Sequence, residues 1–235
     1  MSDKGGTMPK KKISRKELLK TEDEFITFST RALQFIMTHK VRIAYGVGGF
    51  LVLVILFSGF RYFSLKGENK ASALLDQGLE QYQTVLDQKD AVQAYQKVQS
   101  DFNNLLDKYS GKKSGKLARI SFAHICLNAG EYDRAIELYR QALEDFDRDL
   151  SLRDLLLSGL ANSFAGKKDY SAAASYLEEI VSTPESILKD EALFHLGRIY
   201  AAMGNDEKSR YAFSKIVNEY KGSIYFALAQ EKLAG

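Results

Sequence analysis

The sequence predicts an all-α protein: an N-terminal single transmembrane helix followed by an α-solenoid of about four helix pairs and a C-terminal capping helix. Three observations support this fold class. Only two of the 235 residues are proline and none is tryptophan, which favours long helices over a turn-rich β fold. Eighteen consecutive residues carry no charge. Four later segments align at a nearly constant period, as expected for a repeat architecture.

The net charge of +3 is divided unevenly along the chain. Residues 1–42 carry +5, residues 43–60 carry none, and residues 61–235 carry −2. Residues 1–21 are expected to form a disordered, basic cytosolic tail, because lysine and glycine are frequent there and apolar residues are few.

Residues 22–40 are expected to form an amphipathic juxtamembrane helix. Thr21 and Glu24 fit a capping box at its start, and Phe28 and Ile36 belong to an apolar series with helical spacing. Such a helix could lie on the inner leaflet, helped by nearby basic residues. A solvated helix leading into the span is the alternative.

Residues 41–63 are expected to be a transmembrane anchor. The uncharged run has 18 residues, which give roughly 27 Å of helix, close to the hydrocarbon thickness of about 30 Å. A buried core helix would usually show a polar stripe, and a cleaved signal peptide would show a small-residue cleavage site. The anchor residues that we name are Ile43, Phe50, Leu51, Val54, Ile55 and Phe60.

The flanking charges bear on the orientation of this anchor. Three basic residues lie near each end, and further lysines in the tail place the N-terminus in the cytosol and the folded body across the membrane. Ala44 and Gly48 form a small-xxx-small pair that could support a homodimer through the span. Small residues are common in membrane helices without any such role.

Residues 67–235 are expected to form the repeat domain. Equivalent segments begin at Phe102, Tyr139, Leu177 and Phe213, with spacings of 37, 38 and 36 residues. A turn signal precedes most of these segments, so each unit predicts two antiparallel helices, A and B. A single helix pair cannot bury its apolar face, and stacked neighbours are required.

Residues of similar size recur at equivalent positions of these units. Helix A carries a small residue where adjacent helices must approach closely, and helix B carries another. The equivalent sets are Ala123, Ala161 and Gly197 on helix A, and Ala135, Ala173 and Ser209 on helix B. Gly130 and Gly204 stand at turns, and Tyr132 and Tyr170 come two residues after Gly130 and Lys168.

With these residues the chain resembles the tetratricopeptide repeat family over residues 116–149, 154–184 and 190–221. Lys168 stands where the family pattern has glycine. Residues 70–110 match weakly as a first unit, because its helix A does not align cleanly. The resemblance implies a tetratricopeptide-type α-solenoid that binds proteins on a concave face formed mainly by the A helices.

The whole layout resembles a narrower group, the bacterial YfgM-like proteins. A basic tail with the sequence ISRKELLKTEDEF, one span and a repeat body that opens with a long helix carry this resemblance. It implies an inner-membrane protein with a periplasmic repeat domain, ancillary to the Sec translocon. Its partners would be translocon subunits, chaperones or exported proteins.

The sequence offers no catalytic, cofactor-binding or metal-binding constellation. Cys126 lies at a core position of helix A, and His124, two residues away, points elsewhere, so the thiol lacks an oriented base. The three histidines of the chain have no metal-ligand spacing. The segment Gly111–Lys116 lacks the spacing and the preceding strand of a phosphate loop, and is interpreted as a solvated loop between repeats.

The family pattern also predicts the binding groove. It directs one strip of each helix A towards the concave face, and the negative charge of the body argues against nucleic acid as the partner. The strip could instead be covered by the long first helix. The candidate groove residues are Leu117, Ile120, His124, Leu127, Ser158, Asn162, Phe194 and Arg198.

The sequence therefore favours a non-enzymatic, membrane-tethered scaffold for protein partners, at the periplasmic face of a bacterial inner membrane. Two alternatives stay open. One is a cytosol-facing import receptor, although the strip lacks the basic clamp of relatives that bind a C-terminal carboxylate. The other is a membrane-bound regulator that acts through its cytosolic tail.

Overall fold

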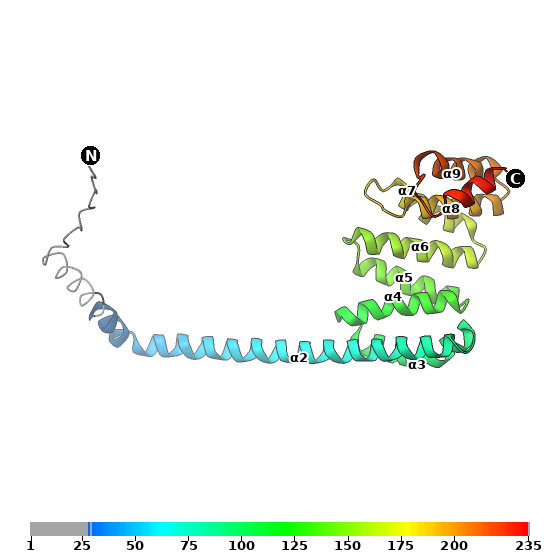
Figure 1. Ribbon diagram of the computed structural model, residues 1–235. Helices are drawn as coiled ribbons and strands as arrows, with labels where there is room; N and C mark the ends of the chain where they lie inside the picture. Colours follow the sequence, from blue (N-terminus) through cyan, green and yellow to red (C-terminus); the bar gives the residue numbers. More distant parts are fainter. Residues whose placement is uncertain (1–27, 29, 235) are drawn as a thin grey trace, which may run out of the picture. The chain divides into compact units, whose positions relative to one another are not determined.

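The computed structural model describes residue 28 and residues 30–234 (Figure 1). Within these residues every regular element is a helix, which confirms the all-α fold class. The expected tail, residues 1–21, lies outside the described residues, as does the start of the expected juxtamembrane helix. Residues 30–38 are helical. The chain divides into two compact units, Met1–Phe63 and Ser64–Gly235.

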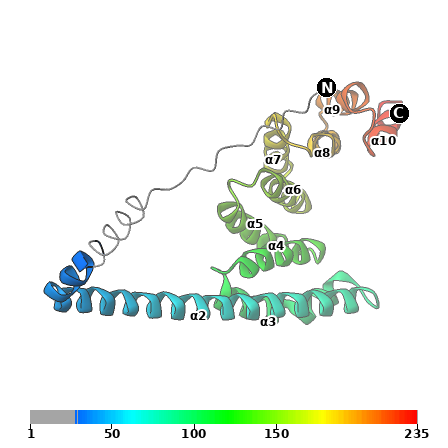
Figure 2. The same cartoon turned by 60° about the vertical axis from the view of Figure 1, so that its left-hand side comes forward.

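The helices from residue 40 onwards follow one another with short connections. Within the second unit, successive helices stack side by side, from α4 to α10 (Figures 1 and 2). They are α2 (Lys40–Leu86), α3 (Ala91–Tyr109), α4 (Lys113–Asn128), α5 (Tyr132–Asp145), α6 (Leu150–Gly166), α7 (Tyr170–Ser182), α8 (Lys189–Ala202), α9 (Asp206–Glu219) and α10 (Phe226–Ala234).

The first unit contains the apolar part of α2. By length and composition alone, α2 is the one helix in the described part of the chain that could cross a membrane. None of the residues in its most apolar 18-residue stretch is buried. Phe50 is 65% exposed and Ile55 is 69% exposed. The apolar side chains of this stretch are therefore not covered by a protein core.

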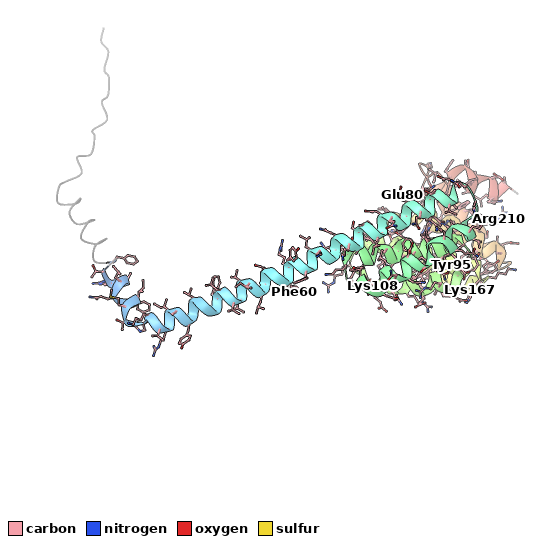
Figure 3. The ribbon with its side chains drawn as sticks, turned by 90° about the horizontal axis from the view of Figure 1, so that it is seen from below. Phe60, Glu80, Tyr95, Lys108, Lys167 and Arg210 are labelled. Atoms are coloured by element: carbon pink, nitrogen blue, oxygen red, sulfur yellow. The ribbon has the colours of Figure 1, made fainter. Side chains whose placement is uncertain are left out.

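The second unit begins with a helix pair that the sequence indicated only weakly. From residue 64 onwards α2 buries Ala71, Leu75, Gly78 and Tyr82, which recur at intervals of three or four residues and so form one face. A Cβ at Gly78 would lie 3.0 Å from the Phe102 ring on α3. Figure 3 shows α3 lying along this part of α2. The C-terminal part of α2 is therefore helix A of the first repeat.

The three later helix pairs turn in the same way, although one of them lacks glycine. Gly130, Lys168 and Gly204 all have positive φ, at 80°, 64° and 72°. In each turn the next residue donates its N–H to a carbonyl five residues back, for example from Asp169 to Phe164 at 2.9 Å. Lys168 thus adopts the left-handed conformation that the family pattern assigns to glycine.

The prediction that Gly111–Lys116 is a solvated loop is wrong for its last four residues. Helix α4 begins at Lys113, and Gly115 is buried in its first turn. The residue before the helix, Lys112, provides no side-chain cap. Glu68 of α2 takes that role, which no local sequence pattern could indicate.

The core is formed by two clusters of buried residues that meet at α6. Leu156 and Leu160 of α6 belong to the cluster of α2 to α6. Leu157 and Ala161, on the adjoining face of the same helix, belong to the cluster that extends to α10. Close packing requires small residues at some contacts: a Cβ at Gly197 would lie 2.6 Å from the Phe213 ring.

Candidate partner-binding face

A cavity of about 600 Å³ opens between the A helices of the first three repeats. Three of its walls come from α2, α4 and α6, and Tyr139 of α5 forms part of its floor. The wall residues are mainly apolar, with a few polar groups among them. They are Leu79, Tyr82, Gln83, Ile120, Ser121, His124, Ile125, Tyr139 and Leu155.

Two of the predicted groove residues, Ile120 and His124, lie in this cavity. They are four residues apart on α4 and so share one helical face. His124 is exposed, whereas Ile120 is half-buried and packs partly on the core.

Sequence reasoning missed Leu79 and Leu155, which are 36% and 50% exposed. Leu155 could have been found, because it precedes the predicted groove residues Ser158 and Asn162 by three and seven residues and so shares their helical face. Leu79 was missed because the first repeat did not align.

The long first helix does not close this cavity. Leu79, Tyr82 and Gln83 of α2 form one wall of the cavity and leave it open. Helix α2 therefore extends the face of the A helices by one more repeat.

The wall of this cavity contains an unpaired polar group. Tyr82 is only 8% exposed. Its hydroxyl is buried and has no hydrogen-bond partner among the described residues. A buried hydroxyl without a partner costs free energy, on the order of 1–3 kcal/mol.

A second, smaller cavity of about 260 Å³ lies between α6, α7 and α8. It brings together two further predicted groove residues, Asn162 and Arg198, with His195 beside them. Burial lowers the pKa of His195, because desolvation disfavours the charged imidazolium. This end of the face is therefore polar, with Arg198 as its exposed cation.

The remaining predicted groove residues lie elsewhere. Ser158 is 7% exposed and its hydroxyl lies 3.3 Å from the Glu191 carboxylate. Phe194 stacks on Tyr225 with 4.8 Å between ring centroids. Leu127 is half-buried against the core. Leu117 is 45% exposed but does not line either cavity.

The one cysteine is part of the core. Cys126 has no exposed surface, and desolvation raises its thiol pKa to about 12. A thiol in that state is a poor nucleophile because the thiolate is the reactive form. Within residue 28 and residues 30–234, no group of three His, Cys, Asp or Glu residues is placed to hold a metal ion.

The predicted anchor residues all lie on the N-terminal part of α2. Ile43 is half-buried, whereas Phe50, Leu51, Val54, Ile55 and Phe60 are between 42% and 76% exposed. At about 100° per residue, all of them except Phe60 lie within an arc of about 140°. Val52, Leu53 and Leu56, which are exposed as well, face the other directions, so the apolar surface surrounds the helix.

Comparison with known proteins agrees with this arrangement of helix pairs. The family described as tetratricopeptide repeat-like domain matches residues 34–234. No curated protein matches the chain.

Among solved structures, BtubC (BKLC) from P. vanneervenii is similar, with a TM-score of 0.57 at 14% identity, over 74% of this chain and 75% of that one. A Podospora anserina putative kinesin light chain with nearly identical tetratricopeptide-like repeats gives a TM-score of 0.55 at 15% identity, over 71% of this chain and 85% of that one. A variant of the same protein gives 0.56, also at 15% identity, over 71% and 84%. At these identities the likeness shows the fold.

Proposed function

We propose that this chain, which belongs to the tetratricopeptide repeat-like domain family, is a non-enzymatic scaffold that a single span tethers to a membrane. Repeats of this family generally mediate protein–protein binding. The observation that carries the proposal is the 600 Å³ cavity on the face of the A helices, combined with an apolar helix whose side chains no core covers.

The cavity fits a segment of a partner protein. Exposed leucines at its rim, Leu79 and Leu155, offer apolar surface to a buried anchor side chain of the partner. His124 and Gln83 provide polar contacts at the edge, as in most sites that combine an apolar floor with few polar groups.

The finer assignment follows the resemblance to YfgM-like proteins. We propose that the N-terminus lies in the cytosol of a bacterium and that the repeat domain lies on the periplasmic side of the inner membrane. The partners are then subunits of the Sec translocon, periplasmic chaperones or exported proteins. The apolar helix and the basic tail support this assignment.

Site-specific crosslinking in cells tests the proposed partners. A photo-reactive residue replaces His124 in the cavity, and in a matched control it replaces Gln141, which is exposed on α5. Translocon subunits or periplasmic chaperones are expected on the first variant and not on the second. The same yield from both positions, or capture of neither partner class, contradicts the assignment.

Protease treatment tests the orientation. The repeat domain should be protected in intact cells and cleaved in spheroplasts, in which the outer membrane is opened. Protection in both preparations would place the repeat domain in the cytosol and overturn the proposed topology.

A further inference from the structure

The turn between α3 and α4 is fixed to α2 a few residues after the apolar run. The ammonium of Lys112 donates to the carbonyl and hydroxyl oxygens of Ser64, at 3.3 and 3.1 Å. The carboxylate of Glu68 accepts from the backbone N–H of Lys113 at 3.0 Å and of Ser114 at 2.7 Å, and from the Ser114 hydroxyl at 2.7 Å. The turn therefore has a defined level along α2.

The residues that hold this turn follow the apolar run closely in the sequence. Ser64 and Glu68 come four and eight residues after Phe60, and a chain extends by at most about 3.5 Å per residue. The headgroup regions add about 10–15 Å in all to a hydrocarbon core of about 30 Å. When the apolar run spans a bilayer, the short separation in sequence keeps Ser64, and the lysines beside it, close to the headgroup layer.

Basic side chains are frequent on α2 beside Ser64 and Glu68 and on the turn that these two residues hold. Lys66 and Lys113 are exposed, and Lys112 is half-buried. Lys70, two residues after Glu68, and Lys108, four residues before Lys112, are exposed as well. We call these five lysines the basic collar. Lys116 is excluded because its ammonium pairs with Asp145 at 2.9 Å.

The acidic group within the collar, Glu68, is held by the first turn of α4. Glu68 accepts three hydrogen bonds at the first turn of α4, and the Ser114 hydroxyl, followed by the backbone N–H groups, lowers its pKa. Its charge is thus compensated by the N-terminus of that helix. Asp107, on α3, is the exposed acid closest in sequence to Lys108. The positive charges of the collar still outnumber the acids beside them.

We propose that the basic collar binds anionic phospholipid headgroups of the membrane that α2 enters, and so holds the first repeat against the bilayer surface. The proposal rests on the membrane insertion under Proposed function. Each lysine close to an anionic surface favours the bound state by roughly fivefold. The clamp on Glu68 and Ser64 positions the lysines of the turn in advance, which reduces the entropy lost on binding.

Fluorescence quenching in proteoliposomes tests this with the full chain. Gly111 lies in the turn, a side chain there meets no atom within 4 Å, and Gly111→Cys accepts a fluorophore. Cys126 is buried and does not compete for the label. The vesicles contain a headgroup-labelled quencher lipid and are made either of phosphatidylcholine alone or of phosphatidylcholine with phosphatidylglycerol.

Stronger quenching is expected with phosphatidylglycerol, and high salt should reduce it because exposed charges are screened. Lys66→Gln/Lys113→Gln should shift the bound-to-free ratio by roughly 25-fold towards the free state. The matched control Lys168→Gln/Lys221→Gln, at two exposed lysines of later turns, should behave as the unmodified chain.

Equal quenching in both lipids, or an unchanged Lys66→Gln/Lys113→Gln variant, would overturn the collar. Alkaline carbonate extraction of the same vesicles separates this failure from a failure of the anchor. A chain that resists extraction but shows no lipid preference contradicts the collar alone. A chain that is released contradicts the membrane anchor and the collar together.

Discussion

Helix α2 consists of two parts with opposite relations to their surroundings. Along its apolar run, Leu53, Ile55 and Phe57 are each at least 66% exposed. In its later part, only every third or fourth residue is buried, from Ala71 to Tyr82. One backbone geometry thus carries an uninterrupted apolar surface and then a single apolar face. The pattern of side chains, and not the helix, decides whether lipid or protein is the matching environment.

The largest effect is expected when a phenylalanine is replaced by alanine in each of the two parts and the free energies of unfolding are compared. Phe122 has no exposed surface and stacks on Phe102 at 5.1 Å between centroids. Phe122→Ala should lower the free energy of unfolding by about 3–5 kcal/mol, since it removes a buried ring and leaves a cavity. Phe57→Ala should leave it nearly unchanged. Denaturant unfolding of the full chain in detergent micelles measures both, and equal losses would remove the distinction.

A charge placed in the apolar run should affect insertion and not folding. Val54→Arg adds about 2.5–3.5 kcal/mol to the cost of a membrane helix near its centre. The fraction of chain that resists carbonate extraction should fall accordingly. Tyr211→Arg is the control, because Tyr211 is 66% exposed on α9, and it should insert as the unmodified chain does. Full insertion of Val54→Arg would show that this run is not a span.

Replacing glycine by alanine, which adds one methyl group, should also affect the repeat domain and the apolar run differently. At Gly197 a Cβ would lie 2.6 Å from the ring of Phe213, which is 3% exposed and cannot move aside freely. Gly197→Ala should cost about 1–3 kcal/mol of unfolding free energy. At Gly48 nothing lies within 4 Å, so Gly48→Ala should cost nothing. Thermal unfolding of both variants in micelles gives the comparison, and a neutral Gly197→Ala would be evidence against this packing.

A smaller effect is expected at the point where the repeats are fixed to α2. Glu68→Ala removes the acceptor for the first turn of α4 and should cost about 1 kcal/mol. Glu80→Ala, at an exposed residue of the same helix, should not.

The effect of Glu68 should also depend on pH. The pKa of Glu68 is lowered in the folded chain. Its contribution is therefore present at neutral pH and is lost as the pH falls through that lowered value. Urea unfolding as a function of pH should show Glu68→Ala and the unmodified chain converging in acid. A constant difference at every pH would assign the effect to something other than this carboxylate.

The smallest expected effect is a gain in stability. Lys168→Gly removes the strain of a left-handed residue, about 1–2 kcal/mol, but makes the unfolded chain more flexible. The net gain should be about 0.5–1 kcal/mol. Gly130→Ala and Gly204→Ala, at equivalent turns with φ of 80° and 72°, should lose stability. Melting temperatures decide, and a loss on Lys168→Gly would show that its side chain is needed there.

The sequence predicted the later repeats well, because their signals are local. A small residue on each helix, such as Ala123 and Ala135, and a turn residue such as Gly130 have fixed spacing along the chain. The family match over residues 34–234 confirms the repeat type. The left-handed conformation of Lys168 was harder to predict, because the residue itself disfavours it and only its position in the repeat requires it.

The features that were missed depend on contacts between distant segments. Glu68 caps a helix that begins 45 residues later, so no motif could join the two. The cavity takes Leu79 from a repeat whose helix A is continuous with the apolar run and therefore carries no start signal. Phe194 was predicted to be open on the face, whereas the ring of Tyr225, from the segment before α10, stacks on it.

Helix α6 connects the two core clusters, and this has a consequence for how the repeat domain unfolds. In a stack of repeats each unit is stabilised mainly by its neighbours. The two sets of side chains on α6, Leu156 with Leu160 and Leu157 with Ala161, make it the common neighbour of both halves. Unfolding of α6 would remove packing contacts from both halves at once, so the domain should melt in one cooperative transition. The amide hydrogens of α6 should then be among the last to exchange.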